Sequence, residues 1–153
     1  NVLVSMNLSS HDLKDHNFIH TVKSKLLEHS VDISNVQFEI TESSYLENFE
    51  NANQFFNQVK VMGGSIALDD FGSGYTHWEL LHLKLADIIK VATQNFPEKQ
   101  SNAIFSASAT FAKNLGLQSI VEGIETPEEM EFAKKAGFNY CQGWLFNSWR
   151  QKA

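Results

Sequence analysis

The sequence has little of several things, and each shortage excludes a class of protein. One cysteine, Cys141, among 153 residues permits neither an internal disulfide nor a zinc site built from several cysteines. Two prolines and eight glycines, beside 42% hydrophobic residues, exclude collagen-like and disordered chains. Twelve Lys and Arg against eighteen Asp and Glu give a net charge of −6, which is the wrong sign for binding the phosphates of DNA or RNA.

Long apolar runs are absent as well. None reaches the roughly 18 residues of a membrane span, and the start, Asn1 to Asn7, has neither the basic residues nor the cleavage site of a secretory signal. We therefore predict a cytoplasmic protein, or the cytoplasmic part of a larger membrane-anchored one. This segment is expected to contact no membrane and no nucleic-acid polymer. Its length suits one domain, 1–153, since no linker divides it.

Short apolar runs alternate with longer segments of helical spacing. The runs predict six strands, at residues 2–7, 36–41, 65–69, 87–91, 118–121 and 140–142. Most of them are separated by apolar residues three or four apart, which is typical of helices. One helix start is explicit, because Thr126-Pro127-Glu128-Glu129 combines an N-cap, a proline at the first position and a capping-box glutamate. Strands alternating with helices predict a mainly parallel sheet of α/β class.

Two α/β architectures compete, a doubly wound open sheet and a (β/α)8 barrel. Successive strands start about 28 residues apart, so eight units would need roughly 220 residues, near the usual ~250 of a barrel. Six units are two short of that number. A barrel that lacks its first part would expose sheet edges and apolar core, which a second chain could cover, so we expect a homodimer.

Polar side chains end every predicted strand. They are Asn7, Glu39, Glu42, Asp69, Asp70, Lys90, Glu122, Glu125 and Gln142. Any one of them alone is more often a turn former or a helix cap. Because the carboxyl ends of parallel strands converge on one face, the set could share one pocket. Divalent cations with oxygen ligands relieve the repulsion among so many carboxylates, so the set predicts Mg²⁺ or Mn²⁺ in a two-metal site.

Two of these strand ends are the most informative. Asp69 and Asp70 close an apolar strand and could reach two metal ions, and Gly72-Ser73-Gly74 after them is predicted to be a flexible active-site loop. That loop has the pattern of neither a dinucleotide fingerprint nor a P-loop. Lys90 stands inside an apolar strand, where it either extends to solvent or orients a metal-bound water and accepts its proton.

Six segments resemble, in order and nearly in spacing, the motifs of the EAL-domain cyclic di-GMP phosphodiesterases. They are Ser5-Met6-Asn7-Leu8-Ser9, Phe38-Glu39-Ile40-Thr41-Glu42-Ser43, Asp69-Asp70-Phe71-Gly72-Ser73-Gly74-Tyr75, Ile89-Lys90, Val121-Glu122-Gly123-Ile124-Glu125-Thr126 and Gln142-Gly143-Trp144-Leu145. The resemblance implies a TIM-like (β/α)8 barrel, incomplete at its N-terminus with about six units present. It also implies bacterial signalling, by hydrolysis of cyclic di-GMP to linear pGpG with Mg²⁺ or Mn²⁺.

The resemblance also assigns roles to individual residues. Asn7, Glu39 and Asp69 resemble ligands of the first metal, and Asp69, Asp70 and Glu122 resemble ligands of the second. Lys90 is similar to the family's lysine that positions or deprotonates the attacking water. Glu125 resembles the glutamate that anchors the Asp-Phe-Gly loop. Asp70, Phe71, Gly72 and Gln142 are expected to contact the substrate.

The Glu-Ala-Leu signature of the family, whose glutamate is a first-metal ligand, does not occur in these 153 residues. One interpretation is a truncated piece of a larger protein with an upstream regulatory domain, in which the parent domain is active and this piece alone is not expected to be. The alternative is a catalytically inactive EAL-like module that senses the nucleotide or binds a protein. An unrelated metal-dependent barrel enzyme is a third reading, if the motif match is accidental.

Overall fold

We describe the protein from a computed structural model, which describes residues 3–72, 86–92, 94 and 98–146. These residues form two compact units. The first unit comprises residues 3–69 and 86–87, and the second comprises the remaining described residues, from 70 onward. Each unit carries three strands, and the strands of each unit are parallel.

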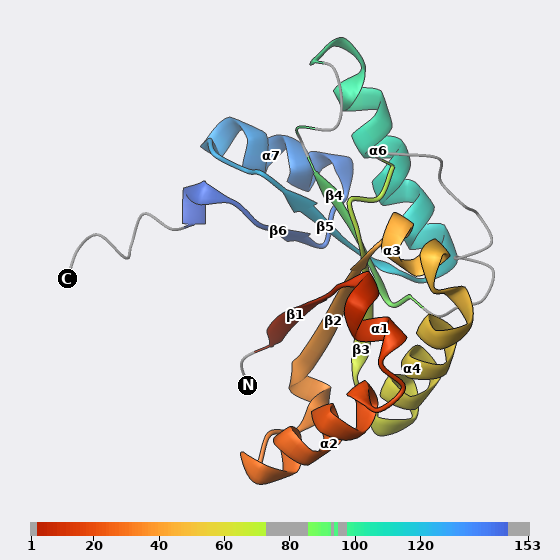
Figure 1. Cartoon of the computed structure of the whole chain (residues 1–153). Coiled ribbons are helices and arrows are strands. Elements are labelled where there is room, and N and C mark those ends of the chain that lie inside the picture. Colours follow the sequence, from red (N-terminus) through yellow and green to blue (C-terminus); the bar gives the residue numbers. More distant parts are fainter. Residues whose placement is uncertain (1–2, 73–85, 93, 95–97, 147–153) are drawn as a thin grey trace. The chain divides into compact units, whose positions relative to one another are not determined.

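In the first unit, strand β2 (Val36–Thr41) lies between β1 (Val4–Leu8) and β3 (Ser65–Asp69). The connections hold the helices, which are α1 (Ser10–Lys14), α2 (Phe18–Glu28), the 3-10 turn η1 (Ile33–Asn35), α3 (Glu42–Glu47) and α4 (Phe49–Met62). Helices α1, α2 and α4 lie along the same side of these strands (Figure 1). Because every strand pair is parallel and joined through helices, this unit is built from βαβ connections.

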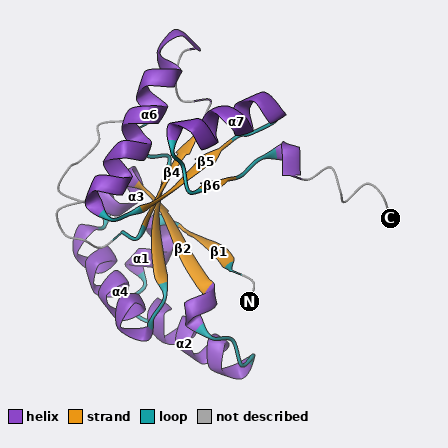
Figure 2. Cartoon of the chain, turned by 180° about the vertical axis from the view of Figure 1, so that it is seen from behind, coloured by secondary structure: helices purple, strands orange, loops and turns teal. Residues whose placement is uncertain are grey.

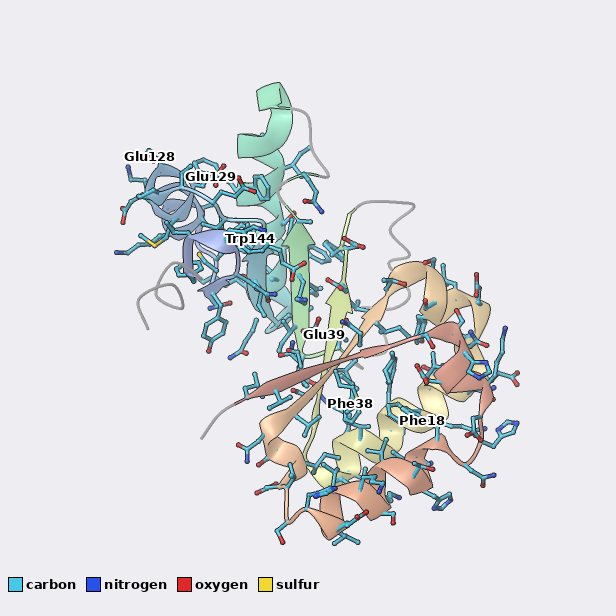
Figure 3. The ribbon with its side chains drawn as sticks, turned by 60° about the vertical axis from the view of Figure 1, so that its left-hand side comes forward. Phe18, Phe38, Glu39, Glu128, Glu129 and Trp144 are labelled. Atoms are coloured by element: carbon cyan, nitrogen blue, oxygen red, sulfur yellow. The ribbon has the colours of Figure 1, made fainter. Side chains whose placement is uncertain are left out.

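The core of the first unit is aromatic. Phe38 of β2 meets Phe55 of α4 edge to face, with ring centroids 5.3 Å apart, and Phe18 of α2 stacks on Phe55 at 5.5 Å. Tyr45 of α3 stacks on Phe56 of α4 at 5.8 Å. Phe38 thus points toward the helices (Figure 3). Since side chains alternate along a strand, the residues on either side of Phe38 face away from the helices.

In the second unit, β5 (Gln118–Glu122) lies between β4 (Ile88–Ala92) and the short β6 (Tyr140–Cys141). Helices α6 (Glu98–Leu115) and α7 (Pro127–Ala136) make the connections (Figure 2). Phe105 of α6 meets Phe132 of α7 and Phe138 at ring-centroid distances of 6.2 and 6.0 Å. These contacts pack the two helices against each other beside the sheet.

The predicted strands are confirmed, two of them with the predicted ends and the others with ends that differ by one or two residues. The predicted start of α7 is also confirmed, because Thr126 accepts a hydrogen bond from the Glu129 main-chain N–H and the Glu129 carboxylate accepts one from the Thr126 N–H. Helices α1 and α3 were not predicted. A single domain remains a prediction. Within the described ranges, no helix is both long enough and apolar enough to cross a membrane.

Candidate active site

In the first unit, the strand register brings predicted metal ligands onto one face of the sheet. Asn7 and Glu39 are direct partners across β1 and β2. Asp69 ends β3 opposite Thr41, which is two residues beyond Glu39 and therefore on the same face of the sheet. Glu39 is only 5% exposed, whereas Asn7 is exposed. This face, opposite the helices, therefore carries the predicted ligands Asn7, Glu39 and Asp69.

A residue that the sequence analysis missed holds the Glu39 carboxylate. The side-chain amide of Gln37 donates a hydrogen bond to Glu39 Oε1 over 2.9 Å. Gln37 itself is 1% exposed and lies on the same face of β2 as Glu39. The available signal was a polar side chain inside an otherwise apolar strand, two residues before a predicted ligand.

In the second unit, two predicted site residues form a buried ion pair. Lys90 Nζ lies 2.7 Å from Glu122 Oε1, and their side chains are 3% and 20% exposed. The register explains the contact, because Glu122 is the partner of Ala92, two residues beyond Lys90 and on the same face. Lys90 therefore does not extend to solvent.

The backbone after β3 is shaped by Asp70. Its φ angle of +54° lies in the left-handed region, which few residues other than glycine adopt. The Phe71 N–H then donates to the Lys90 carbonyl over 2.9 Å, and the Phe71 ring stacks on Phe111 at 5.8 Å. These contacts fasten Asp70, Phe71 and Gly72 beside β4. Ser73 and Gly74 of the predicted flexible loop lie outside the described residues.

Glu125 and Gln142 follow β5 and β6. Both side chains are exposed. Their segments are joined by two main-chain hydrogen bonds. The Ile124 N–H donates to the Gln142 carbonyl over 3.1 Å, and the Gln142 N–H donates to the Val121 carbonyl over 2.8 Å. Gly143 is required here, since a Cβ at this position would lie 2.1 Å from the Ile124 carbonyl oxygen. The loop-anchoring role of Glu125 and the substrate contact of Gln142 remain predictions.

The metal ligands also remain a prediction. Over the described ranges, no three His, Cys, Asp or Glu side chains are grouped so that they could hold a metal ion. The donors offered by the first unit are one amide, from Asn7, and two carboxylates, from Glu39 and Asp69. The second unit offers Asp70 and Glu122. Carboxylate and amide oxygens are the donors that Mg²⁺ and similar hard cations prefer, so the chemistry of this set fits such an ion.

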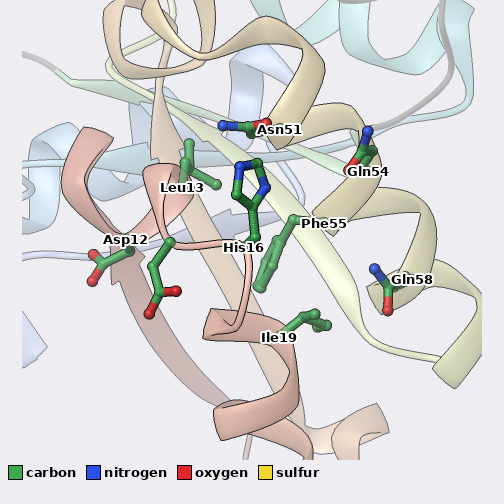
Figure 4. Close-up of a pocket in the computed structure, with 9 residues that line it drawn as sticks. Asp12, Leu13, His16, Ile19, Asn51, Gln54, Phe55 and Gln58 are labelled. Carbon is green, nitrogen blue, oxygen red and sulfur yellow. The ribbon is translucent and has the colours of Figure 1, made fainter.

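A pocket of about 70 Å³ lies on the helical side of the first unit (Figure 4). Its walls come from α1, α2, α4 and the segment between α1 and α2. The lining residues are Asp12, Leu13, Asp15, His16, Ile19, Asn51, Gln54, Phe55 and Gln58. None of the predicted site residues is among them, so this pocket is separate from the strand-end face.

Comparison with known sequences identifies the family. The profile of the EAL domain matches residues 1–148. The chain belongs to the EAL-domain family. The cyclic di-GMP phosphodiesterase PdeR of Escherichia coli is 33% identical over 150 residues, which are 95% of this EAL chain and 23% of PdeR. The bifunctional diguanylate cyclase/cyclic di-GMP phosphodiesterase MucR of Pseudomonas aeruginosa is 31% identical, over 93% of this chain and 21% of MucR.

Solved EAL structures share the fold. The MucR phosphodiesterase in complex with cyclic di-GMP matches with a TM-score of 0.83 and 31% identity, over 94% of this EAL chain and 60% of that chain. The manganese and cyclic di-GMP complex of Klebsiella pneumoniae BlrP1 matches with a TM-score of 0.83 and 27% identity, over 94% and 38% of the two chains. The predicted family and fold class, an incomplete TIM-like barrel, are confirmed.

Proposed function

We propose that this EAL chain supplies metal ligands and a water-positioning lysine to a phosphodiesterase that hydrolyses cyclic di-GMP to linear pGpG. Its relatives PdeR and MucR are cyclic di-GMP phosphodiesterases, and the MucR structure holds cyclic di-GMP. The chain spans about a fifth of the length of these relatives. The proposal therefore concerns the full-length protein that carries this sequence.

The observation that carries the proposal is the buried pair of Lys90 and Glu122. A buried ammonium is strongly unfavourable unless it is paired, and an apolar residue would fill β4 at no such cost. Here the ammonium of Lys90, from the middle of β4, lies 2.7 Å from the carboxylate of Glu122, which lies at the carboxyl ends of the strands of the second unit. These strand ends form the face where parallel α/β folds place their active sites. An ammonium has three N–H donors, and the contact with Glu122 Oε1 needs only one of them.

The roles of the residues follow from their donors. Asn7, Glu39 and Asp69 would hold one divalent ion, and Asp69, Asp70 and Glu122 a second. When bound, Mg²⁺ or Mn²⁺ would polarise the phosphate and stabilise the attacking and leaving oxygens of an in-line displacement. Lys90 would hold the attacking water and receive its proton. Asp70, Phe71, Gly72 and Gln142 would contact the nucleotide, and Glu125 would anchor the loop that contains them.

The test is turnover by the full-length protein. Incubated with cyclic di-GMP and Mg²⁺ or Mn²⁺, it should release pGpG, and a chelator should stop the reaction until metal is restored. Lys90→Met should lower turnover about 10²- to 10⁴-fold, whereas Lys113→Met, at an exposed lysine of α6, should leave it unchanged. A folded protein that binds cyclic di-GMP without hydrolysing it would instead support the inactive sensor module.

Three further proposals concern the surroundings of the domain. We propose a regulatory domain elsewhere in the full-length protein, because PdeR and MucR extend far beyond the matched part. We propose a homodimer, because Leu3, Val4 and Met6 of the first unit are 56%, 54% and 41% exposed and offer apolar surface. Cytoplasmic location is proposed from the cysteine usage, since the single cysteine, Cys141, permits no internal disulfide and suits a reducing compartment.

A further inference from the structure

Gln37 is a buried amide with an unusual set of contacts. It is 1% exposed, in the middle strand of the first unit. Its side-chain nitrogen donates to Glu39 Oε1 over 2.9 Å and to Ser5 Oγ over 3.3 Å. Its side-chain oxygen, Oε1, is buried and has no hydrogen-bond partner within the described part of the chain.

The orientation of this amide follows from its neighbour. An amide turned by 180° would place its oxygen against the carboxylate oxygen of Glu39, and two acceptors repel each other at that distance. The NH₂ group must therefore face Glu39. Both of its N–H groups are used, one on Glu39 and one on Ser5, so the unpartnered oxygen is the consequence of keeping the contact with Glu39.

Apart from its contact with Glu39, folding gives no reason for a glutamine at this position. A buried acceptor without a partner lowers stability, and a leucine or methionine of similar volume would remove it. A residue that costs stability and contacts a predicted ligand is expected to serve that ligand.

We infer that Gln37 is a positioning residue, which holds the Glu39 carboxylate in the orientation that binds a divalent cation. The inference rests on the proposed function, since it takes Glu39 as a metal ligand. A hydrogen bond to one carboxylate oxygen restricts rotation of the group, so that Glu39 is presented to the ion in one arrangement. Hydrogen bonds to metal ligands commonly act in this way and change metal affinity substantially when removed.

The test compares Gln37→Leu with the unchanged full-length protein and with Glu39→Gln. The probe is Mn²⁺, titrated by calorimetry, together with thermal unfolding without metal. Gln37→Leu should weaken Mn²⁺ binding about 10- to 100-fold and leave the unfolding temperature unchanged or raised. Gln37→Asn, whose amide is one methylene shorter, should also weaken binding and serves if the leucine variant does not fold. Gln54→Leu, at an exposed position of α4, is the matched control and should change neither quantity.

The outcomes separate the two proposals. If Glu39→Gln loses Mn²⁺ while the folded Gln37 variants bind it within about twofold of the unchanged protein, the role of Gln37 is overturned and the proposed function stands. A lowered unfolding temperature with unchanged Mn²⁺ affinity would show a purely structural role, which also overturns the inference. If Glu39→Gln binds Mn²⁺ as well as the unchanged protein, Glu39 is not a ligand, and the proposed function fails together with the inference.

Discussion

Lys90 and Glu122 depend on each other. With one partner removed, the other charge remains in a largely buried place, so Lys90→Met should lower the free energy of unfolding by up to about 3 kcal/mol. The double variant Lys90→Met/Glu122→Gln should recover part of that loss, because the carboxylate charge that Lys90 compensates is removed together with the ammonium. In both variants we expect turnover to be about 10²- to 10⁴-fold lower than in the unchanged protein. Urea unfolding and pGpG release measure the two effects, and recovery of turnover in the double variant would contradict the role of Lys90.

Cys141 is expected to react slowly. Burial raises the pKa of its thiol, so less of the reactive thiolate is present at mildly alkaline pH than for a fully exposed cysteine. Modification by a disulfide reagent at about pH 8, near the ordinary thiol pKa, should be severalfold slower in the folded chain than in urea. Equal rates in the two conditions would show that the folded structure does not protect this thiol.

Some residues of the candidate site could be predicted from the sequence alone, whereas others could be found only once the strand faces and register were known. Glu39, Lys90 and Glu122 are visible in the sequence because each is a charged residue within or at the end of an apolar run. Gln37 is not, since a single glutamine within a strand has no meaning until the strand's two faces are known. The pairing of Lys90 with Glu122 likewise requires the register of β4 and β5, which the sequence does not specify.

Among the elements, α7 begins with a capping box that can be tested. Thr126→Ala removes the side-chain oxygen that accepts the Glu129 N–H, so the free energy of unfolding should fall by about 1 kcal/mol. Thr110→Ala changes the same residue type at an exposed position inside α6 and should be neutral or slightly stabilising, because alanine favours helix. Equal losses in urea unfolding for the two variants would mean that the cap contributes nothing specific.

A second capping box, at α1, gives a pH dependence. Hydrogen bonds from the Ser9 hydroxyl and main-chain N–H lower the pKa of Asp12. Stability from this carboxylate is therefore fully present above its ordinary pKa of about 3.9 and is lost as the pH falls through the lower folded value. Asp12→Asn should lower the free energy of unfolding near neutral pH, by less than about 1 kcal/mol because the group is partly exposed. At about pH 2 the same substitution should have little effect. Unfolding curves at the two pH values would show this, and a loss that is equal at both would contradict it.

The two missed helices share a cause. Helices α1 and α3 have five and six residues, too few to show an apolar period. They form where a side chain caps them, since Ser9 accepts from Asp12 N–H and Thr41 accepts from Ser44 N–H. By contrast, α4 and α6 have 14 and 18 residues, and their apolar spacing is clear in the sequence.

For the molecule as a whole, the alternation of strands and helices was enough to predict parallel sheet. The choice between an open sheet and a barrel could not be made from periodicity, because both are built from the same βαβ connections. The resemblance of the strand-end motifs to the EAL family favoured the barrel, and the similarity to EAL structures confirms it. The division into two units had no sequence signal, since no linker separates them.

Self-association should depend on β1. Val4, 54% exposed on the strand at the edge of its three-stranded unit, is expected to contact a second copy. Val4→Lys should shift light-scattering mass from dimer toward monomer. Val61→Lys, at a valine that is 89% exposed on α4, makes the same chemical change on the helical side and should leave the mass unchanged. A monomer at all concentrations of the unchanged protein would contradict the proposed homodimer.

The left-handed backbone at Asp70 has an evolutionary consequence. Aspartate tolerates a φ of +54° better than most residues, but glycine adopts it with less strain. Selection for thermal robustness alone would therefore favour glycine at this position, and only selection for the carboxylate would oppose that drift. The residue at position 70 could then serve as a marker in genome surveys. It would separate EAL domains still under selection for catalysis from EAL domains that have lost catalysis and serve another function.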